Sequence, residues 1–188
     1  MTRLVRATEL MGLPVVTLDT ATAPGEIRDV LFDPARARVV AFTVRGRGLL
    51  SPPLVGLLPS SAIRAVGRSA VMISSDASLL RQREGMSNAL DNQVEVLGKE
   101  VVTERGETLG KVADVVLEVD AGEAVVVGCD VEQANDHRVI LPLAPGTPLS
   151  ADALIVATAA EPYAANGLAG FRDALARVRE GHEEEVSV

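Results

Sequence analysis

Short apolar runs rich in Val, Ile and Leu recur along most of the chain, separated by turn residues such as Gly, Pro, Asp and Asn. Branched β-carbons pack well on a pleated surface, so runs of this kind are typical of β-strands. The pattern predicts strands in the first half at 14–19, 26–33, 38–45, 54–58 and 70–74. It predicts strands in the second half at 101–104, 109–119, 124–131, 137–141 and 153–157.

The number and length of these strands favour a small closed structure. Five or six strands within roughly 65 residues are too few for a wide sandwich, and closing the sheet into a barrel removes its exposed edges. The segment 120–123 contains Gly122 and predicts a hairpin turn between the two longest strands of the second half. We therefore expect a mainly β protein built from small barrels.

Two segments lack this pattern and predict other structure. Residues 78–92 are polar and predict either a short helix or an extended linker. Near the C-terminus, apolar residues recur every three or four positions, which predicts an amphipathic helix that Gly181 ends. These residues are Leu168, Phe171, Leu175 and Val178. An acidic, frayed tail is expected from Glu183 onward.

The strand pattern occurs twice because the chain contains an internal repeat. Four segments of the first half match segments that lie 83 to 86 residues later. The matched pairs are 10–17 with 96–103, 25–33 with 110–118, 58–59 with 141–142, and 69–73 with 152–156. The sequence therefore predicts two tandem domains of one kind, at 1–77 and 93–160. A linker at 78–92 joins them, and a helix with an acidic tail follows at 161–188.

Charge and composition narrow the function classes. The net charge of −8 divides unequally, because residues 1–92 carry a net +3 and residues 93–188 a net −11. The negative charge of the second half repels phosphate and therefore disfavours general nucleic-acid binding. The chain has one cysteine, no apolar run of membrane-spanning length and no signal-peptide pattern at its N-terminus, so we expect a cytoplasmic protein.

No group of residues indicates catalysis. Asp29 and Asp114 occupy equivalent repeat positions, and each is expected to accept hydrogen bonds from the backbone of its neighbouring Gly turn. His137 and His182 stand far apart without the spacing of a metal site. Cys129 lies in an apolar run and is expected to be buried and inert. We therefore predict no enzyme activity, no metal and no cofactor.

One stretch has the composition of a protein interface. Arginines lie near the two ends of the apolar run Val39–Val44, and an apolar segment with two adjacent prolines follows. Arginine beside apolar surface is typical of interface hot spots. The candidate partner-binding residues are Arg36, Arg38, Arg45, Arg47, Leu49, Pro52, Pro53 and Leu54. Two alternatives stay open: the apolar segment packs inside the protein while the arginines are solvated, or the surface binds RNA.

The repeated motif resembles that of the PRC-barrel family. Each copy has an early "L-x-G" segment, a "G-x-hydrophobic-x-D" strand and a Leu-Pro pair before the closing strand. The motif residues are Gly12, Gly25, Asp29 and Pro59 in the first copy, and Gly98, Gly110, Asp114 and Pro142 in the second. Two loops depart from the family pattern: 20–24 lacks an Asp-Gly or Asn-Gly turn, and 144–148 replaces a short helical turn.

The resemblance implies a fold and a class of function. The family includes the cytoplasmic domain of the photosynthetic reaction-centre H subunit and the C-terminal domain of the ribosome maturation factor RimM. It implies two tandem PRC barrels that act as an adaptor and bind a protein partner, with RNA entering only through an RNA-associated complex. The alternative is a regulatory domain that binds a small molecule between the barrels. Independently of the resemblance, the apolar face of the C-terminal helix is expected to pack on the protein's own barrels, with a homodimer or a partner groove as the alternatives.

Overall fold

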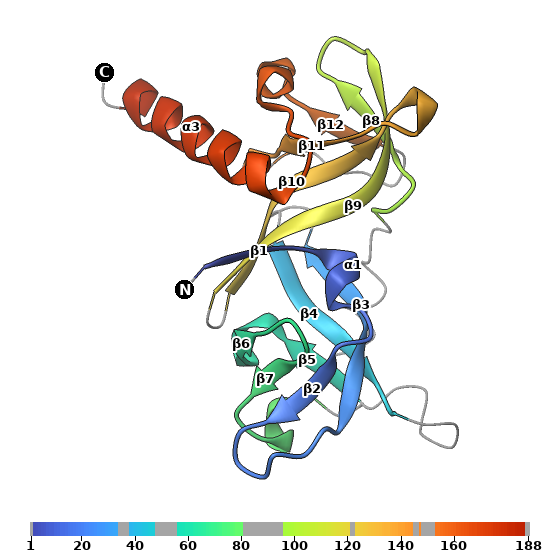
Figure 1. Cartoon of the computed structure of the whole chain (residues 1–188), viewed down its shortest axis with the longest axis vertical. Coiled ribbons are helices and arrows are strands. Elements are labelled where there is room, and N and C mark those ends of the chain that lie inside the picture. The colour runs from blue at the N-terminus through green and yellow to red at the C-terminus, as the bar shows by residue number, and fades with distance from the viewer. Residues whose placement is uncertain are drawn as a thin grey trace. The chain divides into compact units, whose positions relative to one another are not determined.

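A computed structural model describes residues 2–33, 38–47, 56–80, 96–120, 123–144, 147 and 153–186 (Figure 1). Internal contacts divide the chain into two compact units. Unit 1 comprises Met1–Asp33, Arg38–Gln93 and Glu118–Val125. Unit 2 comprises Pro34–Ala37, Val94–Leu117 and Val126–Val188.

Unit 1 is built from short strands with brief helical turns. Its strands are β1 (Arg3–Arg6), β2 (Pro14–Thr17), β3 (Gly25–Asp33), β4 (Arg38–Arg45), β5 (Gly56–Pro59), β6 (Ile63–Val66) and β7 (Val71–Ile73). Its helical turns are α1 (Ala7–Leu10) and the 3₁₀ helices η1 (Ser60–Ala62) and η2 (Asp76–Ser78).

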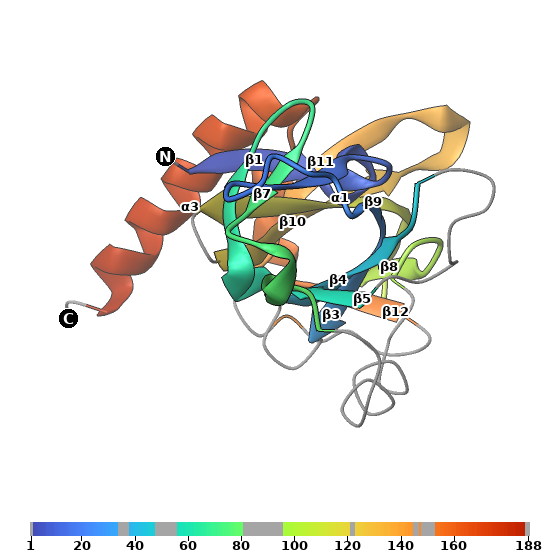
Figure 2. The ribbon, with the colours of Figure 1, turned by 90° about the horizontal axis from the view of Figure 1, so that it is seen from below.

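The strands of unit 1 curl into a small barrel (Figure 2). They are hydrogen-bonded in the order β5–β4–β3–β2–β7–β6, and β2 and β7 run parallel. Leu57 and Leu80 then exchange two backbone hydrogen bonds of 3.0 and 2.8 Å, which pairs β5 with the chain after η2. This pairing leaves less of the barrel edge open, as the strand count predicts. Aliphatic residues such as Val15, Ile27 and Leu58 fill the interior.

Unit 1 also contains the adjoining ends of two strands from the second repeat. These strands are β9 (Thr108–Asp120) and β10 (Glu123–Glu132), and residues 118–125 belong to unit 1. Val125 pairs with Arg38 at the start of β4, and β1 pairs with β9. The Thr2 hydroxyl donates to the Asp120 carboxylate at 3.3 Å. Ala124 is 1% exposed, so this segment contributes to the buried part of unit 1.

Unit 2 contains the remainder of β9 and β10 and the elements around them. These elements are β8 (Glu100–Thr103), η3 (Ala134–Asp136), β11 (Arg138–Pro142), β12 (Ala153–Val156), η4 (Thr158–Tyr163) and α3 (Leu168–Val186). The strand order is β12–β8–β9–β10–β11, and β12 and β8 run parallel. Val101, Leu117, Val131 and Ile140 are among its buried residues.

The strand pairing repeats between the units. Val15 pairs with Val71 in unit 1, and their sequence equivalents Val101 and Leu154 pair in unit 2. The bridge between Leu57 and Leu80 likewise recurs as the bridge between Ile140 and Ala165. The predicted duplication and the mainly β fold class are therefore confirmed.

The described strands begin and end within two residues of the predicted limits, apart from residues 54–55, which lie outside the described part. Strands β1 and β6 were not predicted from the sequence. The predicted end of the C-terminal helix was wrong, because α3 continues past Gly181 to Val186. One interior glycine costs a helix only about 1 kcal/mol, and the glutamates that follow it have good helix propensity.

Candidate protein-binding surface

The start of β4 presents two side chains on the outer face of unit 1. Successive strand residues point to opposite faces, and here Arg38 and Val40 are exposed whereas Val39 is 1% exposed. Val40 is one of the large apolar side chains that stay accessible, at 43%. The exposed face of β4 therefore carries a cation and an apolar side chain two residues apart.

A groove of about 500 Å³ lies over this face, wholly within unit 1. The β4 residues form one part of its lining, the end of β5 with η1 forms another, and the start of β10 forms a third. The lining residues are Arg38, Val39, Val40, Pro59, Ser60, Ser61, Glu123 and Ala124. We call this site the β4 groove.

The groove exists because the neighbours of β4 diverge. Pro59 pairs with Ala41, and beyond it the chain leaves β5 and enters η1. Proline has no backbone N–H to extend the ladder. The first residue of β4, Arg38, pairs with Val125 of β10 instead. Between these two pairs, Val39 and Val40 lie at the edge that faces the groove.

The chemistry of the β4 groove is mixed. Arg38 and Glu123 are both exposed and carry opposite charges, Ser60 and Ser61 supply hydroxyl groups, and Val40 supplies apolar surface. Within the ranges that the structure describes, no three acidic, histidine or cysteine side chains gather as a metal site would require. The lining suits recognition of a polar chain with some apolar character.

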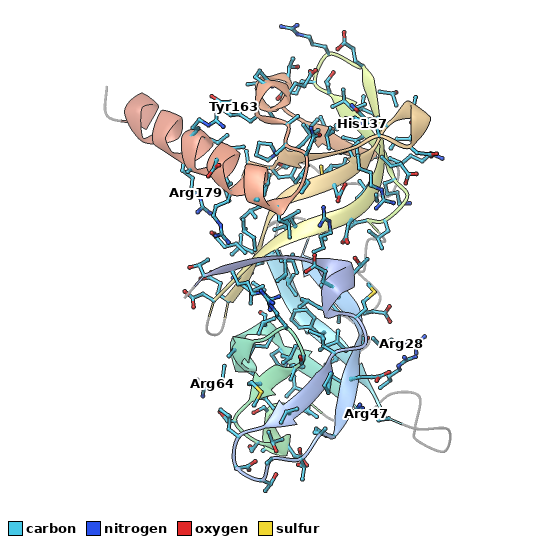
Figure 3. All side chains as sticks on the ribbon, in the orientation of Figure 1. Arg28, Arg47, Arg64, His137, Tyr163 and Arg179 are labelled. Atoms are coloured by element: carbon cyan, nitrogen blue, oxygen red, sulfur yellow. The ribbon has the colours of Figure 1, made fainter. Side chains whose placement is uncertain are left out.

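The predicted arginine surface divides into two parts. Arg38 and Arg45 stand at opposite ends of β4, about 23 Å apart at the rise of an extended strand. Arg45 contacts Glu26 at 2.6 Å, and Arg47 lies 3.9 Å from the same carboxylate. Figure 3 shows Arg28 and Arg47 at the surface of unit 1. Glu26 therefore offsets much of the positive charge at this second end.

The remaining members of the predicted surface are Arg36, Leu49, Pro52, Pro53 and Leu54, and they lie outside the described residues. The candidates predicted from the sequence did not include the groove residues Val40, Ser60, Ser61, Glu123 and Ala124. Nothing in the local pattern indicates that the start of β10 joins the first repeat, because that pairing connects residues far apart in the chain.

The motif glycines have backbone roles. Gly12 and Gly98 have φ values of 79° and 80°, which glycine adopts without a steric penalty. Their N–H groups donate to the carbonyls of Ile27 and Val112, respectively, at 2.8 and 2.7 Å. Each bond links the residues just before β2 or β8 to the strand that follows, β3 or β9, so these glycines shape their barrels.

The two motif aspartates have different surroundings. The Thr43 hydroxyl accepts from the Asp29 N–H at 2.9 Å and donates to the Asp29 carboxylate at 3.3 Å, and Arg28 lies 3.3 Å from that carboxylate. These partners come from β3 and β4 and not from the Gly turn that the sequence analysis expected. Asp114 is 2% exposed and accepts from the Val115 N–H at 2.8 Å.

The strand register places Asp130 where the first repeat has Thr43. Thr43 pairs with Leu57, and Asp130 pairs with Ile140, the equivalent of Leu57. Asp130 is 1% exposed. Unit 2 therefore carries two buried aspartates at the positions where unit 1 has a hydrogen-bonded Asp and Thr.

Cys129 lies beside Asp130 and is fully buried. Burial, and to a smaller extent the negative charge of Asp130, raises the pKa of its thiol from the usual 9.0 to about 12. The thiol therefore stays protonated near neutral pH and is a poor nucleophile.

The described part of α3 packs on its own unit. Phe171 is buried, and a Cβ added to Gly128 would lie 2.5 Å from the end of its ring. Ala174 and Leu175 are also buried, and α3 contacts β11. The apolar face of this part is thus covered by unit 2. None of the helices that the structure describes is both long enough and apolar enough to cross a lipid bilayer.

Two barrels with equivalent parallel strand pairs, β2–β7 and β8–β12, define the class: a tandem of two small β-barrels made by duplication. The family model of the PRC-barrel domain matches residues 3–80 and again 92–161. The chain therefore belongs to the PRC-barrel family. PRC-barrel domains are known protein-interaction modules, and the family is generally non-catalytic. A search of curated proteins finds no match.

Proposed function

We propose that this chain is an adaptor, without catalytic activity of its own, that binds a protein partner through its first PRC barrel. The β4 groove is the observation that carries the proposal. It combines an exposed cation at Arg38, an anion at Glu123 and accessible apolar surface at Val40. Family membership supports the class of function, and the groove supports the location.

Charge supports the choice of the first barrel. The first 92 residues carry a net +3, whereas the rest carries a net −11. Opposite potentials steer partners together and increase the rate of association. A partner with an acidic surface is therefore attracted to the first half and repelled by the second.

Photo-crosslinking tests the proposal. Lys99 and Lys111 are the only lysines and both belong to unit 2, so crosslinkers directed at lysine side chains would not sample unit 1. The photoreactive residue p-benzoylphenylalanine replaces Ser61 in the groove or, as the matched control, Ser69 in the exposed turn before β7. The tagged full chain is irradiated in a cytoplasmic extract of its source cells. We expect one protein to be crosslinked at Ser61 and absent at Ser69.

A second comparison separates the adaptor from the small-ligand alternative. If neither position captures a stoichiometric protein, and a metabolite raises the melting temperature of the purified chain, the adaptor proposal is wrong and the regulatory domain is favoured. We expect no such stabilisation by metabolites and a crosslinked partner that Arg38→Glu weakens.

A further inference from the structure

We propose that the β4 groove holds an extended segment of the partner in which an acidic and an apolar side chain stand two residues apart. This inference rests on the proposed function and specifies the chemistry of the segment that binds. It follows from the spacing of Arg38 and Val40, the charges in the groove and the hydroxyl groups along it.

The spacing comes from β4 itself. Arg38 and Val40 project from the same face of the strand, so their side chains leave the backbone about 7 Å apart. An extended segment lying alongside has the same period, since its alternate side chains also point to one face. An acidic residue facing Arg38 therefore places the residue two positions away over Val40.

The charges favour a peptide over a simple anion. Glu123 lines the same groove as Arg38, so phosphate or nucleic acid would meet repulsion as well as attraction. A peptide presents one acidic side chain to Arg38 and uncharged groups or a cation to Glu123. The hydroxyls of Ser60 and Ser61 are available to its backbone amides and carbonyls.

NMR spectroscopy of the labelled full chain tests the inference with capped pentapeptides. The first probe is Gly-Glu-Ser-Val-Gly, the second replaces its Glu by Lys, and the third is Gly-Glu-Val-Ser-Gly, which shortens the spacing to one residue. We expect the first peptide to shift the Val40 methyl signals and the Ser60 and Ser61 amide signals. The other two are expected to bind about fivefold more weakly, the size of one exposed ion pair or one small apolar contact.

Variants of the chain give the matched comparison. Arg38→Glu is expected to weaken the first peptide about fivefold and to favour the Lys peptide. Val40→Thr keeps the branched shape of the side chain and is expected to weaken the first peptide while leaving the Lys-to-Glu preference unchanged. Arg68→Glu, in an exposed turn of unit 1, is the charge control and is expected to change nothing.

Two results would overturn the inference: equal binding of all three peptides, or shifts that map away from the groove. If a partner is nevertheless crosslinked elsewhere on the chain, the adaptor function stands and only the peptide chemistry of the groove is wrong. If the peptides bind as expected but extracts yield no partner, the groove inference stands and the adaptor role is wrong.

Discussion

Gly25 lies so close to Arg45 that a Cβ at position 25 would be 2.4 Å from the Arg45 carbonyl oxygen. The second barrel repeats this approach, because a Cβ at Gly110 would be 2.2 Å from the Glu132 carbonyl oxygen. In each barrel the start of one strand lies against the end of its neighbour. Glycine is required at both positions for a steric reason that the barrel geometry creates.

Alanine at either glycine should therefore destabilise its barrel. We expect Gly25→Ala and Gly110→Ala each to cost about 1–3 kcal/mol, the range for overpacking, with Gly110→Ala the worse because its φ of 148° is strained for any other residue. Hydrogen exchange read separately for each unit is the measurement, since two barrels need not unfold together.

Gly170→Ala in α3 is the matched control. The nearest side-chain atom to its added Cβ is 3.7 Å away, an ordinary contact, so the change should be neutral or stabilise the helix by up to about 1 kcal/mol. Equal protection in all three variants would mean that the close approach of the strands relaxes without cost.

Exchanging the residues opposite the motif aspartates should affect the two barrels in opposite directions. Asp130→Thr replaces one of the two buried aspartates at these equivalent positions by the residue that hydrogen-bonds Asp29 in unit 1, and is expected to stabilise unit 2 by about 1 kcal/mol. Thr43→Asp removes the hydroxyl that bonds Asp29 and adds a like charge, at a cost of about 1–2 kcal/mol to unit 1. Hydrogen exchange read separately for each unit measures both effects, and a loss of protection in unit 2 of the Asp130→Thr chain would contradict the equivalence of the two sites.

The thiol of Cys129 should make unit 2 sensitive to alkaline pH. Its pKa is about 12 when folded and 9.0 as an ordinary thiol, so unfolding releases a proton above pH 9. The contribution of the protonated thiol to the free energy of unfolding is therefore fully present below pH 9. It falls as pH rises toward 12, by at most about 1.4 kcal/mol per pH unit. Cys129→Ala should remove this part of the slope in urea titrations, and an unchanged slope would contradict the assignment.

The segment 118–125 should support unit 1 although it belongs to the second repeat. Ala124→Asp buries a charge beside β4, and we expect a loss of about 2 kcal/mol or more in the protection of unit 1 amides. Glu123→Ala, at the exposed neighbouring position, is the control and should leave protection unchanged. A loss confined to unit 2 would show that the segment does not stabilise unit 1.

Much of the fold could be predicted from the sequence because the chain repeats itself and its strands alternate in a clear pattern. The hairpin of β9 and β10 was found from its turn and the long apolar runs on both sides. Strands β1 and β6 were missed because each has four residues and carries arginine, which weakens the apolar pattern. The departure at 20–24 also has a local explanation, since the hydroxyls of Thr17, Thr20 and Thr22 bond one another within 3.1 Å.

The candidate site was predicted less well. Arg38 was identified from its position beside an apolar segment, but its neighbours in the groove come from three separate stretches of chain. Charge alone did not separate Arg38 from Arg45, because the contact between Arg45 and Glu26 depends on strand pairing. Pairing between distant strands is set by the tertiary fold, which local patterns do not specify.

Hydrogen exchange of the full chain is the most direct test of the claim that the partner binds at the β4 groove. It is measured with and without the partner that photo-crosslinking identifies. Binding at the β4 groove predicts slower exchange of the backbone amides at residues 38–40, 60–61 and 123–125, with no change in β8 and β12 of unit 2. Arg38→Glu should weaken binding and reduce this protection, whereas Arg105→Glu, in an exposed turn of unit 2, should preserve it. Protection confined to unit 2, or protection in unit 1 that Arg38→Glu does not alter, would contradict binding at the β4 groove.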